Sequence, residues 1–108
     1  MAGAHPIDKL FATIAARRKA DPKSSYTAQL LAQGVQKCAK KFGEEAVEAA
    51  LAAVSKDKKA LAAESADVLY HLLVLWAASG ITPDDVYAAL EAREGQSGLA
   101  EKAARKKR

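Results

Sequence analysis

The sequence has little of several things, and each shortage excludes a class of protein. A single cysteine, Cys38, excludes an internal disulfide and fits a reducing compartment. The longest apolar stretch, residues 68–78, is interrupted by His71 and is about half of the roughly 20 residues that a membrane-spanning helix needs. The N-terminus has no basic segment followed by an apolar run, so no signal peptide is expected. These shortages predict a soluble, cytoplasmic protein with no membrane partner.

Glycine, proline and aromatic residues are also scarce, with 6 Gly, 3 Pro and 6% aromatics in 108 residues. Half of the residues are apolar, many of them alanine, and there is no run of the alternating β-branched residues that are typical of strands. We therefore expect an all-α fold, a bundle of four to five helices in a single domain that covers residues 1–108. The expected helices span roughly residues 6–20, 26–33, 35–54, 59–78 and 83–94.

The charge is unevenly distributed along the chain. The formal net charge is +4, but five of the seventeen basic residues lie in a basic C-terminal tail, residues 99–108. Without them, twelve basic residues stand against thirteen acidic ones. The tail has no interleaved aromatic residue, and no nucleic-acid recognition motif accompanies it. We interpret it as a solvated end of the domain and expect no nucleic-acid partner.

What the sequence does have is two short groups of acidic residues. The first is Glu44-Glu45-x-x-Glu48, and the second, after a short linker, is Glu64-x-x-Asp67. At about 100° per residue, the acids of each group lie within one third of a helix surface. If the two helices pack antiparallel, several carboxylates meet in a small volume and repel one another unless a cation binds between them. Oxygen ligands without histidine or cysteine suit a hard divalent ion, and we expect Mg²⁺.

An ordinary solvated helix face is the alternative for the first group. Lys40 and Lys41 would then each pair with a glutamate one turn further along, for only about 0.2–0.5 kcal/mol per pair. The second group argues against this alternative, because it opens the most apolar helix in the chain and buried carboxylates need partners. Lys37 and Lys41 project near the first acidic group, where they either bind the phosphates of a polyphosphate ligand or balance the acids.

The fourth expected helix is unusually apolar. Between residues 68 and 76 every residue except His71 is apolar or aromatic, so the helix has no obvious solvent face. One way to bury such a helix in so small a domain is against a second copy of the chain, and we expect a homodimer. His71 follows Asp67 by one turn, and we interpret it as a donor that orients a carboxylate or as a core residue. Residues 25–27 could face a ligand, but nothing else in the sequence supports that.

Longer segments narrow the interpretation. They are Ser25-Tyr26-Thr27, Lys40-Lys41-Phe42-Gly43-Glu44-Glu45-Ala46, Glu64-Ser65-Ala66-Asp67-Val68-Leu69-Tyr70-His71-Leu72-Leu73 and Ser97-Gly98-Leu99-Ala100-Glu101-Lys102-Ala103. The acidic motifs on paired helices resemble those of the MazG-like all-α nucleotide pyrophosphohydrolases. The longer segments resemble the phosphoribosyl-ATP pyrophosphatase family, and the resemblance runs from about residue 7 to residue 106. In many organisms this activity is fused to a cyclohydrolase, for which the chain has no room, so it resembles the stand-alone form.

This resemblance implies a function and a set of site residues. The function is the Mg²⁺-dependent hydrolysis of phosphoribosyl-ATP to phosphoribosyl-AMP and pyrophosphate, the second step of histidine biosynthesis, by a homodimer with composite sites. The family's acid positions fall on Glu45, Glu48, Glu64 and Asp67, which would bind the metal, with Glu44 completing the catalytic motif. The family's lysine pair falls on Lys40-Lys41, whereas helical projection favours Lys37 and Lys41 for the substrate phosphates.

Two other functions remain open at this point. One is a MazG-like enzyme that removes non-standard nucleoside triphosphates, which would differ from the first in its preferred substrate. The other is a non-catalytic helical dimerisation module whose acids are merely solvated. For such a module, neutralising the acids should change neither an activity nor a response to Mg²⁺.

Overall fold

A computed structural model of the chain describes residues 5–94 and Arg105. The elements are α1 (Pro6–Ala16), the short 3-10 helix η2 (Arg17–Lys19), α2 (Tyr26–Gln33), α3 (Val35–Val54), α4 (Lys58–Ser79) and α5 (Pro83–Arg93). No strand occurs in these described residues, and the prediction of an all-α fold with four to five helices is confirmed. The predicted basic tail, residues 99–108, lies outside the described residues except for Arg105.

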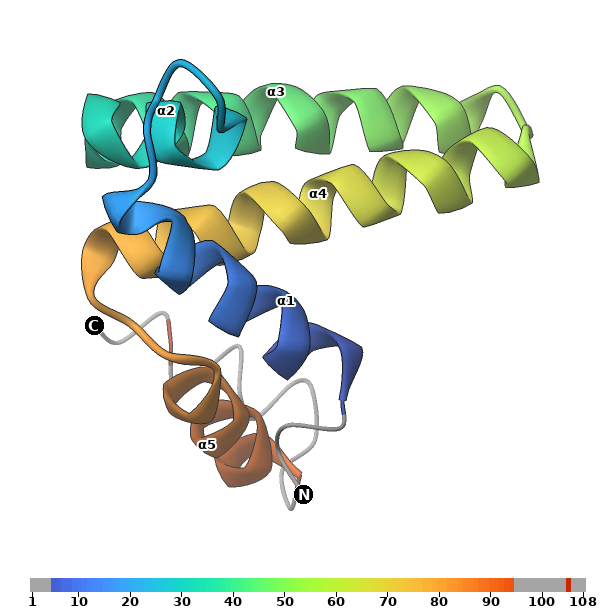
Figure 1. The fold of residues 1–108 in the computed structure, drawn as a ribbon. Helices are drawn as coiled ribbons and strands as arrows, with labels where there is room; N and C mark the ends of the chain where they lie inside the picture. The colour runs from blue at the N-terminus through green and yellow to red at the C-terminus, as the bar shows by residue number, and fades with distance from the viewer. Residues whose placement is uncertain (1–4, 95–104, 106–108) are drawn as a thin grey trace.

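The two long helices, α3 and α4, form an antiparallel hairpin that is the centre of the fold (Figure 1). Asp57 sets the start of α4, because its side chain accepts a hydrogen bond of 2.9 Å from the backbone N–H of Ala60. Gly80 ends the helix in the left-handed conformation, with φ of 79°, which only glycine adopts without strain. The sequence thus encodes both ends of the helix that contains the second acidic group.

The hydrophobic core lies at one end of this hairpin, where α1 and α2 pack against it. Its buried members are Ile14, Leu30, Leu31, Cys38, Leu73, Val74 and Ala77. Cys38 is 1% exposed and its Sγ donates to the carbonyl of Leu30 at 3.2 Å, so it is a core residue. Arg18 fastens η2 to the same end of the hairpin by donating to the carbonyl of Ala77.

One expectation about the helices needs correction. The first helix was expected to continue almost to Asp21, but the α-helix ends at Ala16 and the chain tightens into a 3-10 turn. In the single chain the buried residues of α4 are confined to its C-terminal half, and the burial of its apolar surface against a second copy of the chain stays a prediction. The single chain leaves the rest of α4 partly open, for example at Leu69, which is 43% exposed.

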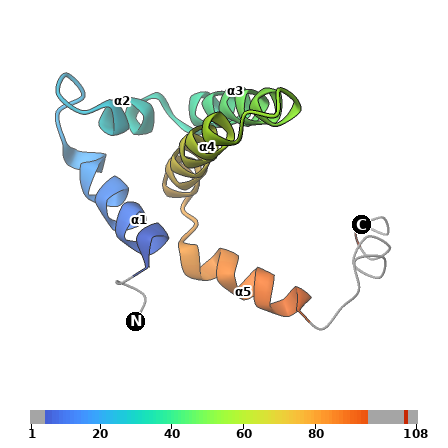
Figure 2. The same cartoon turned by 90° about the vertical axis from the view of Figure 1, so that its right-hand side faces the viewer.

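Helix α5 extends away from the hairpin (Figure 2) and contacts α1. It begins with a complete capping box, in which Thr82 and Asp85 satisfy each other's backbone N–H groups. The Tyr87 hydroxyl donates to Asp8 at 3.1 Å and so joins α5 to α1. The helix starts where the Thr-Pro-Asp-Asp sequence predicts, and it lies apart from both acidic groups.

Candidate active site

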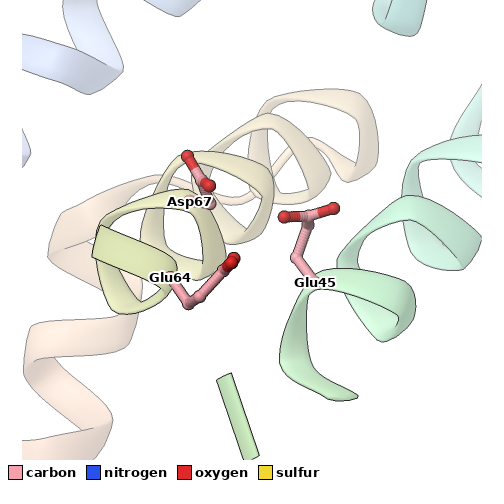
Figure 3. Close-up of side chains that lie close together, drawn as sticks. All are labelled: Glu45, Glu64 and Asp67. Atoms are coloured by element: carbon pink, nitrogen blue, oxygen red, sulfur yellow. The ribbon is translucent and has the colours of Figure 1, made fainter. Parts of the chain in front are cut away.

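Three carboxylates from the two helices of the hairpin meet between those helices (Figure 3). Glu45 comes from α3, and Glu64 and Asp67 come from successive turns of α4. One oxygen from each of the three lies within 4.8 Å of the others. The three-residue spacing of the α4 pair places both side chains on the face that meets α3.

Burial and mutual repulsion both act on the pKa of Glu64. Burial, first of all, and then the negative charges of Asp67, Glu48 and Glu45 raise the pKa of this carboxyl above its usual value. Glu64 is half-buried, whereas Asp67 and Glu48 are exposed. The site therefore concentrates negative charge, and a cation bound there would relieve the repulsion.

The donor set fits a hard divalent cation. It consists of carboxylate oxygens, which Mg²⁺ prefers, and contains no thiol or imidazole ligand among the three grouped residues. Two oxygens bound to one Mg²⁺ at about 2.1 Å are at most about 4.2 Å apart. Rotation of the side chains can close the observed spacing to that value, so the residues present fit the ion.

The other predicted site residues lie around this group and not within it. Glu48 is outside the three-carboxylate group, although its charge acts on Glu64. Glu44 is half-exposed and forms an ion pair with Lys41, with 3.3 Å between Lys41 Nζ and Glu44 Oε1. This bond is the main reason why the pKa of Lys41 is raised. Lys37 is exposed on the first half of α3.

An aromatic cluster lies beside the acidic group, and sequence reasoning placed it only in part. The cluster is Tyr26, Thr27, Tyr70 and His71. Thr27 and Tyr70 share a hydroxyl–hydroxyl hydrogen bond of 2.5 Å. The His71 ring lies edge-on to Tyr70, at 4.9 Å between centroids, and edge-on to Tyr26, at 6.2 Å. Only their place in the family-like segments pointed to Tyr26 and Thr27, since no periodicity separates a ligand-facing tyrosine from a core tyrosine.

His71 is the connection between the aromatic cluster and the acids. It is 7% exposed, and its Nδ1 is buried without a hydrogen-bond partner. Burial, first of all, lowers the pKa of its imidazole, and Lys41 lowers it further, whereas Glu45 and Asp67 act in the opposite direction. The imidazole is therefore neutral at pH 7. Nδ1 makes no hydrogen bond that would orient a carboxylate, so this nitrogen does not play the role expected from the sequence.

An all-α domain with facing carboxylates between two antiparallel helices has the architecture of the MazG-like class, as the resemblance predicted. A family model described as phosphoribosyl-ATP pyrophosphohydrolase matches residues 7–94 of the chain. The chain belongs to that family, and it is a hydrolase.

Proteins named phosphoribosyl-ATP pyrophosphatase are similar to this chain over almost its whole length. A phosphoribosyl-ATP pyrophosphatase from Parvibaculum lavamentivorans is 63% identical over 107 residues, which are 99% of this chain and 98% of the relative. One from Cereibacter sphaeroides is 62% identical over 99 residues, 92% of this chain and 96% of the relative. One from Paracoccus denitrificans is 56% identical over 108 residues, 98% of this chain and all of the relative. The resemblance stated from the sequence is confirmed.

Proposed function

We propose that this enzyme hydrolyses phosphoribosyl-ATP to phosphoribosyl-AMP and pyrophosphate, the second step of histidine biosynthesis, in the cytoplasm. Family membership supports the substrate and the reaction. The observation that supports the chemistry is the convergence of Glu45, Glu64 and Asp67 between α3 and α4. A non-catalytic module has no need to hold three like charges together at the cost of a raised pKa at Glu64.

The three grouped carboxylates would hold Mg²⁺, and Glu48, close enough for its charge to act on Glu64, would complete the acid set. When bound, the ion supplies positive charge to the phosphate oxygens and to the leaving pyrophosphate. Lys41 lies at the border of the acids and now neutralises Glu44. Exchange of that carboxylate for a substrate phosphate would let Lys41 bind the polyphosphate, and Lys37, one turn earlier on α3, would extend the same positive surface.

A direct assay tests the proposed reaction. Purified protein incubated with phosphoribosyl-ATP and Mg²⁺ should release pyrophosphate and phosphoribosyl-AMP in equal amounts, and EDTA should stop the release. Deoxynucleoside triphosphates and non-standard nucleoside triphosphates are the matched controls. Faster turnover of those controls would assign the chain to a different substrate within the same chemistry. No turnover of either phosphoribosyl-ATP or the controls would remove the proposal.

We further propose that the enzyme works as a homodimer that covers the open half of the hairpin. On α3, Val47, Leu51 and Val54 form a stripe one turn apart and are 58%, 54% and 77% exposed. Exposed apolar stripes of this kind mark interaction surfaces. The radius of gyration is 15.9 Å, whereas a compact domain of this length has about 13 Å, so the single chain is incompletely packed.

Exposed apolar helices can also be buried in a membrane, and α4 is the helix for which this must be considered. The helix is long and apolar enough to cross a membrane, with a mean hydropathy of 1.3, and only 22% of that stretch is buried in the single chain. However, it contains Glu64 and Asp67, and an aspartate at the centre of a bilayer costs about 2.5–3.5 kcal/mol. A second copy of the chain covers α4 without placing these acids in lipid.

The oligomeric state tests the dimer. Sedimentation velocity at micromolar concentration should give twice the mass of the chain, and Leu51→Asp should shift the protein to monomer because it places a charge in the stripe. Lys56→Asp, at an exposed turn residue beyond the stripe, is the control for a change of charge alone. A wild-type monomer under these conditions would overturn the dimer and leave the reaction to be judged by its own assay.

A further inference from the structure

The buried Nδ1 of His71 lacks a partner, and buried polar atoms without partners are rare in folded proteins. A leucine or phenylalanine would fill the same space in an aromatic cluster without that cost. An unpaired nitrogen at this position is therefore better explained by a partner that arrives with a ligand than by packing. The charges of Glu45, Asp67 and Lys41 act on this imidazole, so His71 lies close to the acidic group.

Tyr26 lies beside His71 and is far more exposed to solvent than His71 is. Its side chain is 50% exposed although it belongs to the cluster, with its ring nearly parallel to that of Tyr70, at 20° and 6.5 Å, and edge-on to that of His71. The hydrogen bond between Thr27 and Tyr70 fixes the inner ring of the pair. The outer ring thus presents an aromatic surface to the solvent on a rigid support, and its hydroxyl acts electrostatically on Lys41 at the border of the acids.

We propose that Tyr26 and His71 bind the nucleobase of the substrate, with the Tyr26 ring as a stacking surface and His71 Nδ1 as a polar contact. This inference rests on the proposed nucleotide substrate and adds the part of the site that recognises the base. Rotation of the half-exposed Tyr26 side chain toward a bound base exposes the imidazole edge next to it. Tyr70, whose ring lies nearly parallel to that of Tyr26, is a positioning residue that limits how far the Tyr26 ring can turn.

The chemistry of a purine suits both contacts. Its flat π-system stacks on tyrosine, and stacking on an aromatic side chain is independent of the base's hydrogen-bonding edge. Its ring nitrogens accept hydrogen bonds and its exocyclic amine donates them, so a neutral imidazole finds a partner in either tautomer. The polyphosphate of the same ligand then extends toward Lys41 and the carboxylates, which provide no surface for a base.

Two ligands that share phosphates but differ in the base separate this proposal from a general effect on the site. One is α,β-methylene-ATP, in which the bond between the first two phosphorus atoms resists hydrolysis, and the other is inorganic tripolyphosphate. Titration calorimetry with Mg²⁺ should show that Tyr26→Ala raises the Kd of the nucleotide about tenfold. The Kd of tripolyphosphate should change less than twofold, and Tyr26→Phe should leave both values near those of the wild type.

The same pair of ligands tests the nitrogen of His71. His71→Phe keeps an aromatic ring and removes Nδ1, so it should weaken nucleotide binding about fivefold, whereas His71→Asn keeps a polar atom near that position and should retain part of the binding. Tripolyphosphate binding should be unaffected in both. Circular dichroism and thermal unfolding show whether each variant is folded. If His71→Phe does not fold, His71→Leu, which also removes the nitrogen, takes its place, and if Tyr26→Ala does not fold, Tyr26→Leu takes its place.

Three results would overturn the inference. These are equal losses for the two ligands, no loss for the nucleotide with Tyr26→Ala, or a nucleotide that binds the wild type no better than tripolyphosphate. With phosphoribosyl-ATP, Tyr26→Ala should raise KM and leave kcat within about threefold, because stacking is equally strong in the ground state and the transition state. If the wild type released no pyrophosphate, the proposed reaction would fail, while the two-ligand comparison would still decide whether a base is recognised.

Discussion

The two halves of α4 differ in what they contribute to the protein. The C-terminal half contains every buried residue of the helix, namely His71, Leu73, Val74 and Ala77. The N-terminal half contains Glu64 and Asp67 and has no buried residue. One helix thus stabilises the fold at one end and positions the carboxylates at the other.

This division shows how a small domain tolerates a concentration of like charge. Apolar burial at about 25 cal/mol per Å² stabilises the end of the hairpin where α1 and α2 pack. Because α3 and α4 are continuous helices, the packed end also holds the acidic part of the hairpin together. The acids there are partly open to solvent, so their repulsion is screened and its cost is moderate. Substitutions in the two halves of α4 should therefore have opposite consequences for stability and for activity.

The largest expected effect is on activity in the acidic half. Glu64→Gln should lower kcat/KM for phosphoribosyl-ATP at least about a hundredfold, because it removes a charged ligand from the proposed metal site. The same change should raise the Tm of the metal-free protein, since it removes one of three repelling charges. A pyrophosphate-release assay and thermal unfolding in EDTA measure the two quantities.

The matched control for that variant is Glu91→Gln, an exposed glutamate on α5 at a distance from the acidic group. It should change neither activity nor Tm appreciably. If Glu64→Gln unfolded the protein instead, the carboxylate would have a structural role, and the contrast between the two halves of α4 would be wrong.

A large effect on stability is expected in the packed half. Leu73 is 0% exposed in the core between α1, α2 and α3, so Leu73→Ala should lower the free energy of unfolding by about 2–5 kcal/mol. The kcat of the remaining folded protein should stay near that of the wild type. Denaturant titration measures the loss, and Leu90→Ala, at a residue that is 54% exposed on α5, is the control. If both variants lost the same unfolding free energy, Leu73 would not belong to the core in which the structure places it.

The sequence predicts much of this division because helix ends have local causes. A serine and a threonine cap, a proline at the first position and glycine at the end are all visible in the chain, and they predict the starts of α2 and α5 closely. Periodicity also predicts that the carboxylates of Glu64 and Asp67 share a face. These features depend on neighbours within one turn, which the sequence displays directly.

What the sequence does not predict depends on how helices pack. The packing of α3 against α4 brings Glu45 to the α4 pair, whereas Glu44 pairs with Lys41, although both glutamates belong to the same motif. The partnerless Nδ1 of His71 is likewise a result of tertiary packing. Tertiary packing also decides which part of the apolar fourth helix a single chain leaves open, and the sequence does not show this.

A smaller effect is expected at the start of α4. Asp57→Ala removes the side-chain acceptor for the backbone N–H of Ala60 and should cost about 1 kcal/mol of unfolding free energy. Asp57→Asn should retain most of the stability, because asparagine caps as well as aspartate does. Activity should be nearly unchanged in both variants, since Glu64 lies almost two turns further along. A large loss of activity with Asp57→Ala would show that the first turn of α4 also sets the position of the acids.

The smallest expected effect is on the pH dependence of stability without metal. The raised pKa of Glu64 means that the folded state holds this proton more tightly than the unfolded state does. Its contribution to stability is therefore fully present below the ordinary value of 4.5 and is lost as the pH rises through the folded pKa. Glutamine has no such proton, so the Tm difference between Glu64→Gln and the wild type should grow in favour of the variant as the pH rises from 4.5 toward 7. Thermal unfolding in EDTA across that range measures it, and Asp67→Asn should reduce the growth because Asp67 is the charge that acts most strongly on Glu64. A Tm difference that is constant with pH would contradict the interpretation that like charges repel one another in the N-terminal half of α4.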